Sequence, residues 1–375
     1  MAVYRLFPES DTFLYTEEVT GNAGLDEIIE LGGYPISQIG QTSRLLVKYN
    51  TAQIQDVVDN KIGSNPFTSS LHFYLASAYE LPHSYSLNAY PVYDQWTPGV
   101  GKYGDIAVDK SGASWIYTKG QASVSRWTLP ENTSPMPAYV TGSYNDTYSG
   151  GGGSWYTGSA AGLDVSGVAT FELTQDHDID IDITNAVLLH YSESIDNNGY
   201  IVKLTDDLEF NTTSSIRLKY YSADTNTIYP PYLEFKWDDS SYVTGSLTVV
   251  DTDECSIRLT NNRGRYVDEG KQRFRLHARP QYPVRTFTTG SAYAQKYALP
   301  EESYWGIRDE FTEEMIIPFD TNCTKISCDA NGPYFDIYMD GLQPERYYRL
   351  LVKSLIDGTN TIINSGDTFK VVRNG

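Results

Sequence analysis

Short stretches in which apolar and polar residues alternate run through most of the chain, and glycine, proline or asparagine separates them. Alternation with a period of two places successive side chains on opposite faces, so this pattern predicts β-strands joined by turns. The clearest stretches in the first 240 residues are 11–16, 27–31, 43–49, 70–76, 85–93, 169–173, 199–204, 215–221 and 232–237.

Two stretches depart from this pattern and predict short helices. In residues 51–62, apolar side chains recur at helical spacing behind a cap at Thr51. A second helix is expected to start at residues 183–191, with Thr184 as its cap. The apolar residues of the first helix are Ile54, Val57, Val58 and Ile62.

Residues 142–158 form a glycine-rich segment with four glycines in succession. Glycine loses much backbone freedom on ordering, so we expect a long surface loop here, with a tethered linker as the alternative. Tyr144, Tyr148, Trp155 and Tyr156 have no local core in this segment, and we expect them to contact a glycan or a protein partner. The alternative is that Trp155 folds back onto its own domain as a plug.

A domain boundary is predicted near residues 238–241, which gives a first domain of residues 1–239 and a second of residues 240–375. Strand alternation restarts at residues 245–251. Cations then cluster over about two strands, where they pair with an acidic face of a neighbouring subunit or form the solvated face of an edge strand. They are Arg258, Arg263, Arg265, Lys271, Arg273, Arg275 and Arg279.

The composition agrees with an all-β protein of two domains. The 375 residues include 31 Tyr, 13 Phe and 6 Trp, together with 30 Gly and 17 Pro. Aromatic side chains suit half-buried pleated surfaces, and glycine and proline form the turns between them. No repeat of fixed period and no heptad pattern occurs, which argues against solenoids, propellers and a fibre shaft.

The net charge of −20 argues against nucleic acid as a partner, because binding requires a basic surface that displaces phosphate counterions. No apolar run of 18 residues occurs, so no membrane-spanning helix is expected. Cys255, Cys323 and Cys328 match no strong metal signature, and we expect free thiols. The first residues have neither a basic nor an apolar region of the kind a signal peptide needs.

Six short motifs follow one another through residues 1–239. They lie at residues 11–24, 44–49, 87–96, 112–115 with 153–155, 182–184 and 222–233. Their order resembles that of the jelly-roll modules called DNRLRE or disaggregatase-related domains, which are similar to carbohydrate-binding modules. The resemblance implies an N-terminal β-sandwich jelly roll. The chain differs from that family in its longer Trp-rich loops and in lacking a Thr-Trp-Asn-Asn run after Trp96.

Residues 341–350 read Gly-Leu-Gln-Pro-Glu-Arg-Tyr-Tyr-Arg-Leu. They resemble the Gly-Leu-x-Pro-x-x-x-Tyr element of fibronectin type III domains, in which a tyrosine hydrogen-bonds back across a corner. The resemblance gives this role to Tyr348 and implies a smaller Ig-like, fibronectin-III-like β-sandwich. The run of residues 274–348 also resembles the C-terminal parts of structural proteins of large tailed bacteriophages.

Four aspartates alternate along residues 176–182 and would share one face of a strand. Carboxylate oxygens suit Ca²⁺, so Asp176, Asp178 and Asp180 are the candidate calcium ligands. Alternate positions are spread about 7 Å apart along a strand, however, so a solvated strand face that leads into a helix cap is the other reading.

Catalysis is not predicted from these residues. The five histidines form no H-E-x-x-H arrangement, and neither a G-x-S-x-G motif nor a P-loop occurs. Adjacent acids such as Glu301 and Glu302 point apart on a strand and make no glycosidase pair by themselves. We therefore predict a protein that is not an enzyme and has no cofactor other than the candidate Ca²⁺.

The composition resembles that of extracellular proteins, yet no export signal is present, and a virion component resolves this conflict. We predict a structural virion protein of a tailed bacteriophage that is assembled in the host cytoplasm. It would be an accessory protein of the head, neck or tail, or a decoration of the capsid. Its partners would be other virion proteins in a homo- or hetero-oligomeric assembly, with a host cell-surface glycan as a further contact. The alternatives are a non-catalytic carbohydrate-binding surface protein and a polysaccharide-degrading tail enzyme.

Overall fold

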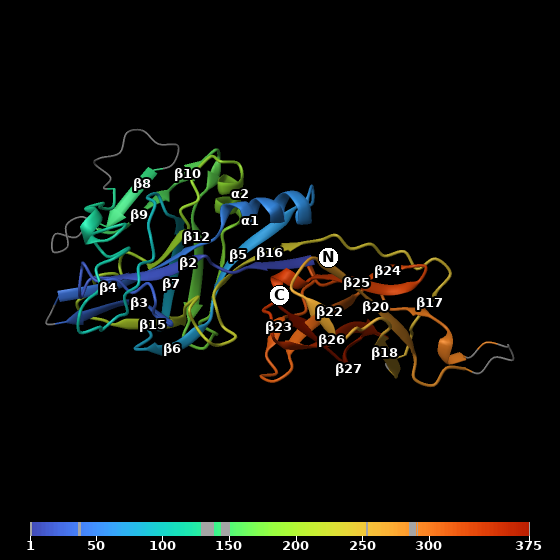
Figure 1. Ribbon diagram of the computed structural model, residues 1–375. Helices are drawn as coiled ribbons and strands as arrows, with labels where there is room; N and C mark the ends of the chain where they lie inside the picture. The colour runs from blue at the N-terminus through green and yellow to red at the C-terminus, as the bar shows by residue number, and fades with distance from the viewer. Residues whose placement is uncertain are drawn as a thin grey trace. The chain divides into compact units, whose positions relative to one another are not determined.

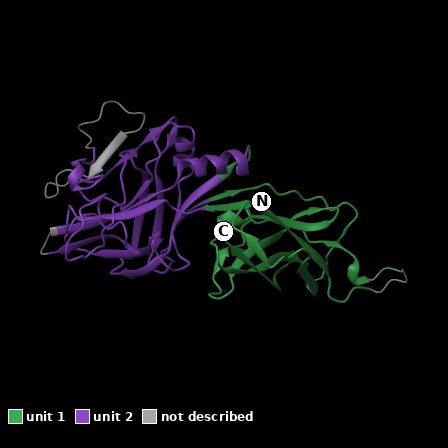
Figure 2. Ribbon diagram, in the orientation of Figure 1, with its two compact units in different colours: residues 1–5, 64–67, 235–375 green, residues 6–63, 68–234 purple. Residues whose placement is uncertain are grey.

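The computed structural model in Figure 1 describes residues 2–36, 39–128, 139–143, 151–252, 254–284, 290 and 292–374. Strands dominate and two short α-helices accompany them, so the predicted all-β class is confirmed. The chain divides into two compact units (Figure 2). Unit 1 comprises Met1–Arg5, Ser64–Phe67 and Phe235–Gly375, and unit 2 comprises Leu6–Gly63 and Thr68–Glu234. The predicted boundary at residues 239 and 240 lies a few residues beyond this division.

Unit 2 contains a large antiparallel sheet. Its strands are β2 (Ser10–Tyr15), β3 (Ile28–Ile36), β4 (Ile39–Lys48), β6 (Leu75–Tyr79), β7 (Ser84–Pro91), β12 (Gly167–Glu172), β14 (Tyr200–Leu204) and β15 (Ile216–Tyr221). The order is β12-β7-β14-β4-β3-β15-β6, with β2 also paired to β4. Strand β4 joins two parts of the sheet, because its first half pairs with β3 and its second half with β2 and β14.

A second sheet has the order β1-β16-β5-β13, so that β13 is an edge strand. These strands are β1 (Ala2–Leu6), β5 (Phe67–Phe73), β13 (Ile179–Asp182) and β16 (Tyr232–Trp237). Unit 2 also contains two small strand pairs: β8 (Tyr139–Ser143) with β9 (Gly151–Thr157), and β10 (Ser159–Ala160) with β11 (Leu163–Asp164).

Both predicted helices form, with caps other than those expected. Helix α1 (Thr51–Asp56) continues into a π-helical turn, η1 (Val57–Ile62), and the side chain of Asn50 rather than Thr51 caps it by accepting from Ala52 N at 2.9 Å. All four apolar residues of the predicted helical face are buried. Helix α2 (Thr184–Tyr191) starts after Ile183, and its first N–H donates to the carboxylate of Asp182 at 2.8 Å.

Unit 1 is sandwich-like, with two sheets that share one core. The first has the order β17-β21-β20-β25-β24, with β18 paired to β20, and the second has the order β19-β27-β26-β22-β23. The strands are β17 (Thr248–Val249), β18 (Cys255–Leu259), β19 (Arg265–Val267), β20 (Lys271–Pro280), β21 (Tyr297–Ala298), β22 (Ser303–Asp309), β23 (Met315–Ile317), β24 (Ser327–Asp329), β25 (Gly332–Tyr338), β26 (Tyr347–Ile356) and β27 (Thr359–Val372).

Stacked aromatic rings fill the core of unit 1. The ring of Phe335 stacks on Phe274 at 5.6 Å and on Trp305 at 5.2 Å between centroids. Phe369 extends this group from β27, and Val3 joins the same core from the start of the chain. The buried Tyr348 makes the bond of a tyrosine corner, because its hydroxyl donates to Gln343 O at 2.8 Å. Cys255, Cys323 and Cys328, which all lie within the described residues, form no disulfide bond.

Candidate functional site

The aromatic residues predicted to contact a ligand lie inside unit 2 where the structure describes them. Trp155 and Tyr156 are each 4% exposed, on strand β9. Tyr144 and Tyr148 lie outside the described residues. Trp155 belongs to a buried cluster, as the plug alternative expects, and its ring stacks on Tyr90 at 6.1 Å. The cluster also contains Trp96, Trp115 and Trp127.

Glycine permits this arrangement, and the expectation of a surface loop was wrong for residues 151–157. They form the buried strand β9 instead. Gly152 has a φ of +77°, and a Cβ there would lie 2.6 Å from Trp115 Cζ2 and 2.7 Å from Arg44 Nη1. Side chains other than hydrogen would therefore prevent the backbone from closing over the indole and the guanidinium. The glycines serve close packing rather than flexibility.

A buried charge network holds this cluster on the sheet. The guanidinium of Arg44 lies between the rings of Trp115 and Trp155, 5.0 Å from each centroid. It donates two hydrogen bonds to Glu209, at 2.7 and 2.6 Å, and a third to Gly152 O at 2.6 Å. Lys203 lies 3.1 Å from the same carboxylate. Each charge is paired, which is the condition under which ions persist in a protein interior.

The aspartates proposed as calcium ligands each have a separate local contact. Asp178 accepts from Leu75 N at 2.6 Å, and Asp176 accepts from the backbone of Asp178. Asp180 lies opposite His72 on β5, with 3.4 Å between carboxylate and imidazole. Within the described residues, no group of three His, Cys, Asp or Glu side chains is placed to hold a metal ion. Charged side chains along β13 protect an edge strand from pairing with another chain.

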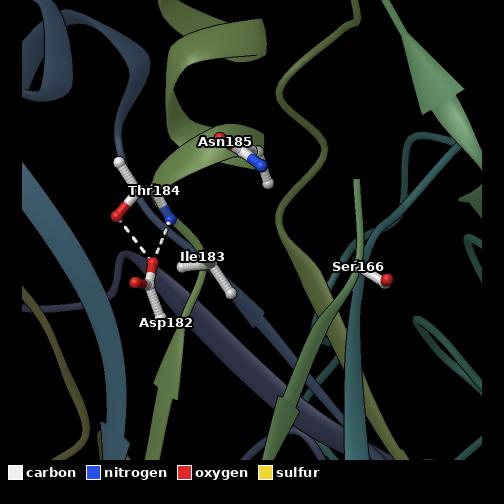
Figure 3. Close-up of a pocket in the computed structure, with 6 residues that line it drawn as sticks. Ser166, Asp182, Ile183, Thr184 and Asn185 are labelled. Atoms are coloured by element: carbon white, nitrogen blue, oxygen red, sulfur yellow. Dashed lines mark hydrogen bonds between the residues drawn. The ribbon is translucent and has the colours of Figure 1, made fainter. Parts of the chain in front are cut away.

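A polar hollow of about 210 Å³ opens at the start of helix α2 (Figure 3). In Figure 3, Asp182 accepts hydrogen bonds from both the N–H and the hydroxyl of Thr184, while Ser166 lies apart from them, just before strand β12. Hydroxyl, amide and carboxylate groups of this kind suit a small polar molecule. The lining residues are Ser166, Asp182, Ile183, Thr184, Asn185 and Ala186.

The predicted basic cluster falls mainly on β20, an interior strand of unit 1 rather than an edge strand. Arg273 forms a bidentate pair with Asp336 at 2.8 and 3.0 Å, and Arg275 forms one with Asp329 at 2.9 and 2.7 Å. Both guanidinium groups also lie against the ring of Tyr334. Strands β24 and β25 thus supply the acidic partners within the same unit.

An exposed aromatic pair stands at one end of the second sheet of unit 1. Phe311 is 77% exposed at the turn between β22 and β23, and its ring meets that of Tyr347 edge-on at 5.9 Å. Across the sheet, Tyr347 lies opposite Lys370, which lies opposite Arg265. These four side chains form a continuous row, called here the aromatic–cation row.

The turn that carries Phe311 is rigidly built. Asp309 is fully buried, and one of its carboxylate oxygens accepts from Phe311 N and from Thr312 N, both at 2.9 Å. Its other oxygen lies 3.3 Å from Arg346. Burial raises the pKa of Asp309, but these hydrogen bonds and the guanidinium outweigh burial and hold the pKa below its usual value. An ionised, buried carboxylate thus fixes the backbone that presents an exposed ring.

Local sequence patterns did not predict the aromatic–cation row. One signal was available, because Phe311 is a lone aromatic in the run Asp-Glu-Phe-Thr-Glu-Glu. No protein-family model matches the sequence, and no curated protein matches it. Among the described residues, no helix is long and apolar enough to cross a membrane. Function is therefore inferred from the residues and their geometry.

Proposed function

We propose that this chain is a structural virion protein of a tailed bacteriophage, which docks onto other virion proteins through unit 1. The observation that carries the proposal is the aromatic–cation row. Protein interfaces are enriched in aromatic residues and arginine, and a few anchors that fill pockets on the partner supply most of the binding energy. Phe311, held by a rigid turn, has the form of such an anchor.

The exposed cation of the row specifies the partner. Lys370 lies 5.6 Å from the ring of Tyr347 and already pairs with Glu345, whereas Arg265 is exposed beyond it. Complementary charge at an interface steers the encounter and rejects wrong partners. A docking partner would offer an apolar pocket for Phe311 with carboxylates at its rim.

The resemblances to jelly-roll modules and to fibronectin type III domains supply the architecture of this proposal. Unit 2 would be a jelly roll and unit 1 an Ig-like module, joined in one accessory protein of the head, neck or tail. The virion location rests on the extracellular type of composition and on the resemblance of residues 274–348 to structural proteins of large tailed bacteriophages. The chain would act without catalysis, by occupying a defined place in an assembly.

Quantitative mass spectrometry of purified particles tests the proposal. Particles would be produced from a genome that carries the wild-type chain, Phe311→Ser or Ile362→Ser. Ile362 is the matched control, because it is an exposed apolar residue of the same unit, outside the row. We expect wild type and Ile362→Ser at equal copy number, and Phe311→Ser reduced at least tenfold. Particles without the wild-type chain would refute the virion role, and normal incorporation of Phe311→Ser would refute docking through the row.

A second candidate function, non-catalytic carbohydrate binding, is favoured by the hollow beside α2. Its hydroxyl, amide and carboxylate groups can exchange hydrogen bonds with sugar hydroxyls. A glycan array with the wild-type chain and Asn185→Ala tests this function. Binding that is lost in Asn185→Ala would support a sugar site in the hollow, and absence of binding by the wild-type chain would eliminate it.

A further inference from the structure

Charge is distributed unequally between the two units. Unit 2 contains 10 lysines and arginines against 28 aspartates and glutamates, which gives −18, whereas unit 1 contains 18 against 20, which gives −2. Almost the whole net charge of −20 thus belongs to unit 2. Within this acidic unit, one segment has the opposite sign. Residues 97–126, called here the loop layer, contain four cations and two anions.

The loop layer is an ordered structure with a buried inner side. The side-chain amide of Asn22 donates to Pro98 O and to Ala113 O, and its carbonyl oxygen accepts from Gly101 N at 2.9 Å. Two isolated bridges, Ser111 with Gly120 and Tyr117 with Arg126, join its strand-like parts. Trp115 on its inner side is fully buried in the tryptophan cluster.

The outer side of the loop layer is apolar and cationic. Ile106 is fully exposed, Val124 is 70% exposed and Val100 is 62% exposed. Val124 has a φ of +57°, a conformation that a β-branched residue rarely adopts, so the layer holds this side chain outward at a conformational cost. Exposed apolar residues grouped with polar neighbours mark interaction surfaces. The accompanying cations are Lys102, Lys110, Lys119 and Arg126.

Two of these cations are available to a partner. Lys110 and Lys119 are exposed and have no carboxylate partner among the described residues. The other lysines of unit 2 lie near an acid of their own unit: the exposed Lys102 near Glu27, and the partly buried Lys48 and Lys219 near Glu9 and Glu30. The loop layer therefore combines apolar contact area with uncompensated positive charge.

The same unit carries a surface of opposite character. Residues 127–202 contain no lysine or arginine and ten acids. Strands β12 and β13, both edge strands, contact each other in this stretch, and the exposed acids Glu172, Asp176 and Asp180 lie on or beside them. Val168 and Leu173 are exposed in the same place. This acidic edge offers both features that the loop layer would need in a partner.

We propose that the loop layer binds the acidic edge of a second copy of this chain. The aliphatic side chains of the layer pack against Val168 and Leu173, while Lys110 and Lys119 meet the carboxylates of the edge. Because the two surfaces differ, the contact is head-to-tail and repeats from copy to copy, as rings and filaments require. At physiological salt the charge of each copy is screened beyond about 8 Å, so contact pairs persist while repulsion between whole copies weakens.

Sedimentation velocity of the full-length chain tests this proposal without reference to any virion. The measurement covers micromolar to submillimolar protein at 0.15 M and 1 M NaCl. We expect reversible association of the wild-type chain. The double variant Lys110→Glu, Lys119→Glu should weaken this association at least tenfold and leave the melting temperature unchanged. Ile106→Asp should weaken it as well. Lys353→Glu with Arg373→Glu in unit 1 makes the same charge change and should have no effect.

A charge exchange separates a specific contact from a general charge effect. Glu172→Lys with Asp176→Lys should weaken association by itself, and combination with Lys110→Glu and Lys119→Glu should restore it. A wild-type chain that stays monomeric throughout the range would overturn the proposal. So would undiminished association of the Lys110→Glu, Lys119→Glu variant, equal weakening by the unit 1 control, or failure of the exchange to restore association.

Discussion

Units 1 and 2 use the same types of residue for different purposes. Unit 2 is rich in tryptophan and buries it, with Arg44 stacked between two indoles and neutralised by Glu209. Unit 1 buries a compact aromatic core and leaves Phe311 and Tyr347 at its surface. The proposed docking surface is therefore distinguished by the rigidity and exposure of an aromatic side chain, rather than by a place in a glycine-rich segment.

Buried carboxylates differ between the units in the same way. Asp309 in unit 1 receives two backbone N–H groups and faces Arg346, whereas Asp11 in unit 2 receives one N–H, from Ala223, at 2.8 Å. Burial raises the pKa of Asp11 to about 7, while the pKa of Asp309 is lowered. Unit 2 therefore contains the more strongly pH-dependent interior.

The largest expected effect is the loss of charge balance inside unit 2. Glu209→Gln leaves Arg44 buried without a counter-ion and leaves Lys203 with the exposed Asp206 alone. It should lower the free energy of unfolding by about 3–5 kcal/mol. Glu310→Gln removes the partner of Arg349 at the surface of unit 1 and should cost about 1 kcal/mol or less. Urea unfolding measures both. Equal losses would show that the two pairs do not differ as described.

Removing the buried ring of Trp155 and, separately, the exposed ring of Phe311 tests whether aromatic residues stabilise unit 2 but not the surface of unit 1. Trp155→Ala opens a cavity in the tryptophan cluster and should lower stability by about 3–5 kcal/mol. Phe311→Ser should change stability by about 0.5 kcal/mol or less, because the ring is mostly exposed. A Trp155→Ala chain that melts like wild type yet loses a glycan ligand would restore Trp155 as a binding residue.

A fall in pH and a rise in pH should each destabilise unit 2, through different buried residues. Burial lowers the pKa of His190 to about 4, below its unfolded value of about 6.5, so its contribution to stability is lost as pH falls from about 6.5 to about 4. The raised pKa of Asp11 has the opposite sign, and its contribution is lost as pH rises from about 4 to about 7. At about 1.4 kcal/mol per pKa unit, the contribution is at most about 3 kcal/mol for His190 and about 4 kcal/mol for Asp11.

Melting curves between pH 4 and pH 8 separate the two groups. Asp11→Asn should remove the part of the pH dependence that destabilises the chain toward neutral pH, and His190→Gln the part that destabilises it toward acid. Asp309→Asn in unit 1 should instead lower stability throughout the neutral range, because it removes an ionised, hydrogen-bonded carboxylate. Unaltered pH profiles in the first two variants would contradict the assignment.

A small difference in stability is expected at the corner of unit 1. Tyr348→Phe removes the hydroxyl that donates to Gln343 O and should lower stability by about 1 kcal/mol. Tyr347→Phe, at the adjacent exposed position, should have no measurable effect on the urea midpoint. A corner bond that contributes to folding requires the two variants to differ.

Much of the fold follows from the sequence. The β-class, the buried strand at residues 43–49 and the apolar face of the first helix are read from local periodicity, which is the information a sequence carries most directly. The candidate site could be predicted from the sequence only in small part. Trp115 and Arg44, distant in sequence, approach the backbone of Gly152 too closely for a side chain to fit, and no local pattern indicates that approach.

Charge pairing was equally hidden from local patterns. The cations of β20 looked uncompensated because their partners, Asp329 and Asp336, lie more than 50 residues further along the chain. The exposure of Phe311 depends on a turn built around the buried Asp309, which is also a matter of tertiary contacts. Composition placed aromatic residues in the protein but did not distinguish core from surface.

Site-specific photocrosslinking in assembled particles tests the docking of unit 1 most directly. The change Phe311→p-benzoylphenylalanine places the reactive group at the tip of the aromatic–cation row, and the same change at Ile362 serves as the control. The account predicts that illumination links position 311 to one virion protein, at an apolar segment flanked by acidic residues, and leaves position 362 unlinked. Particles that contain the chain but give no crosslink from position 311, or equal crosslinks from both positions, would contradict it.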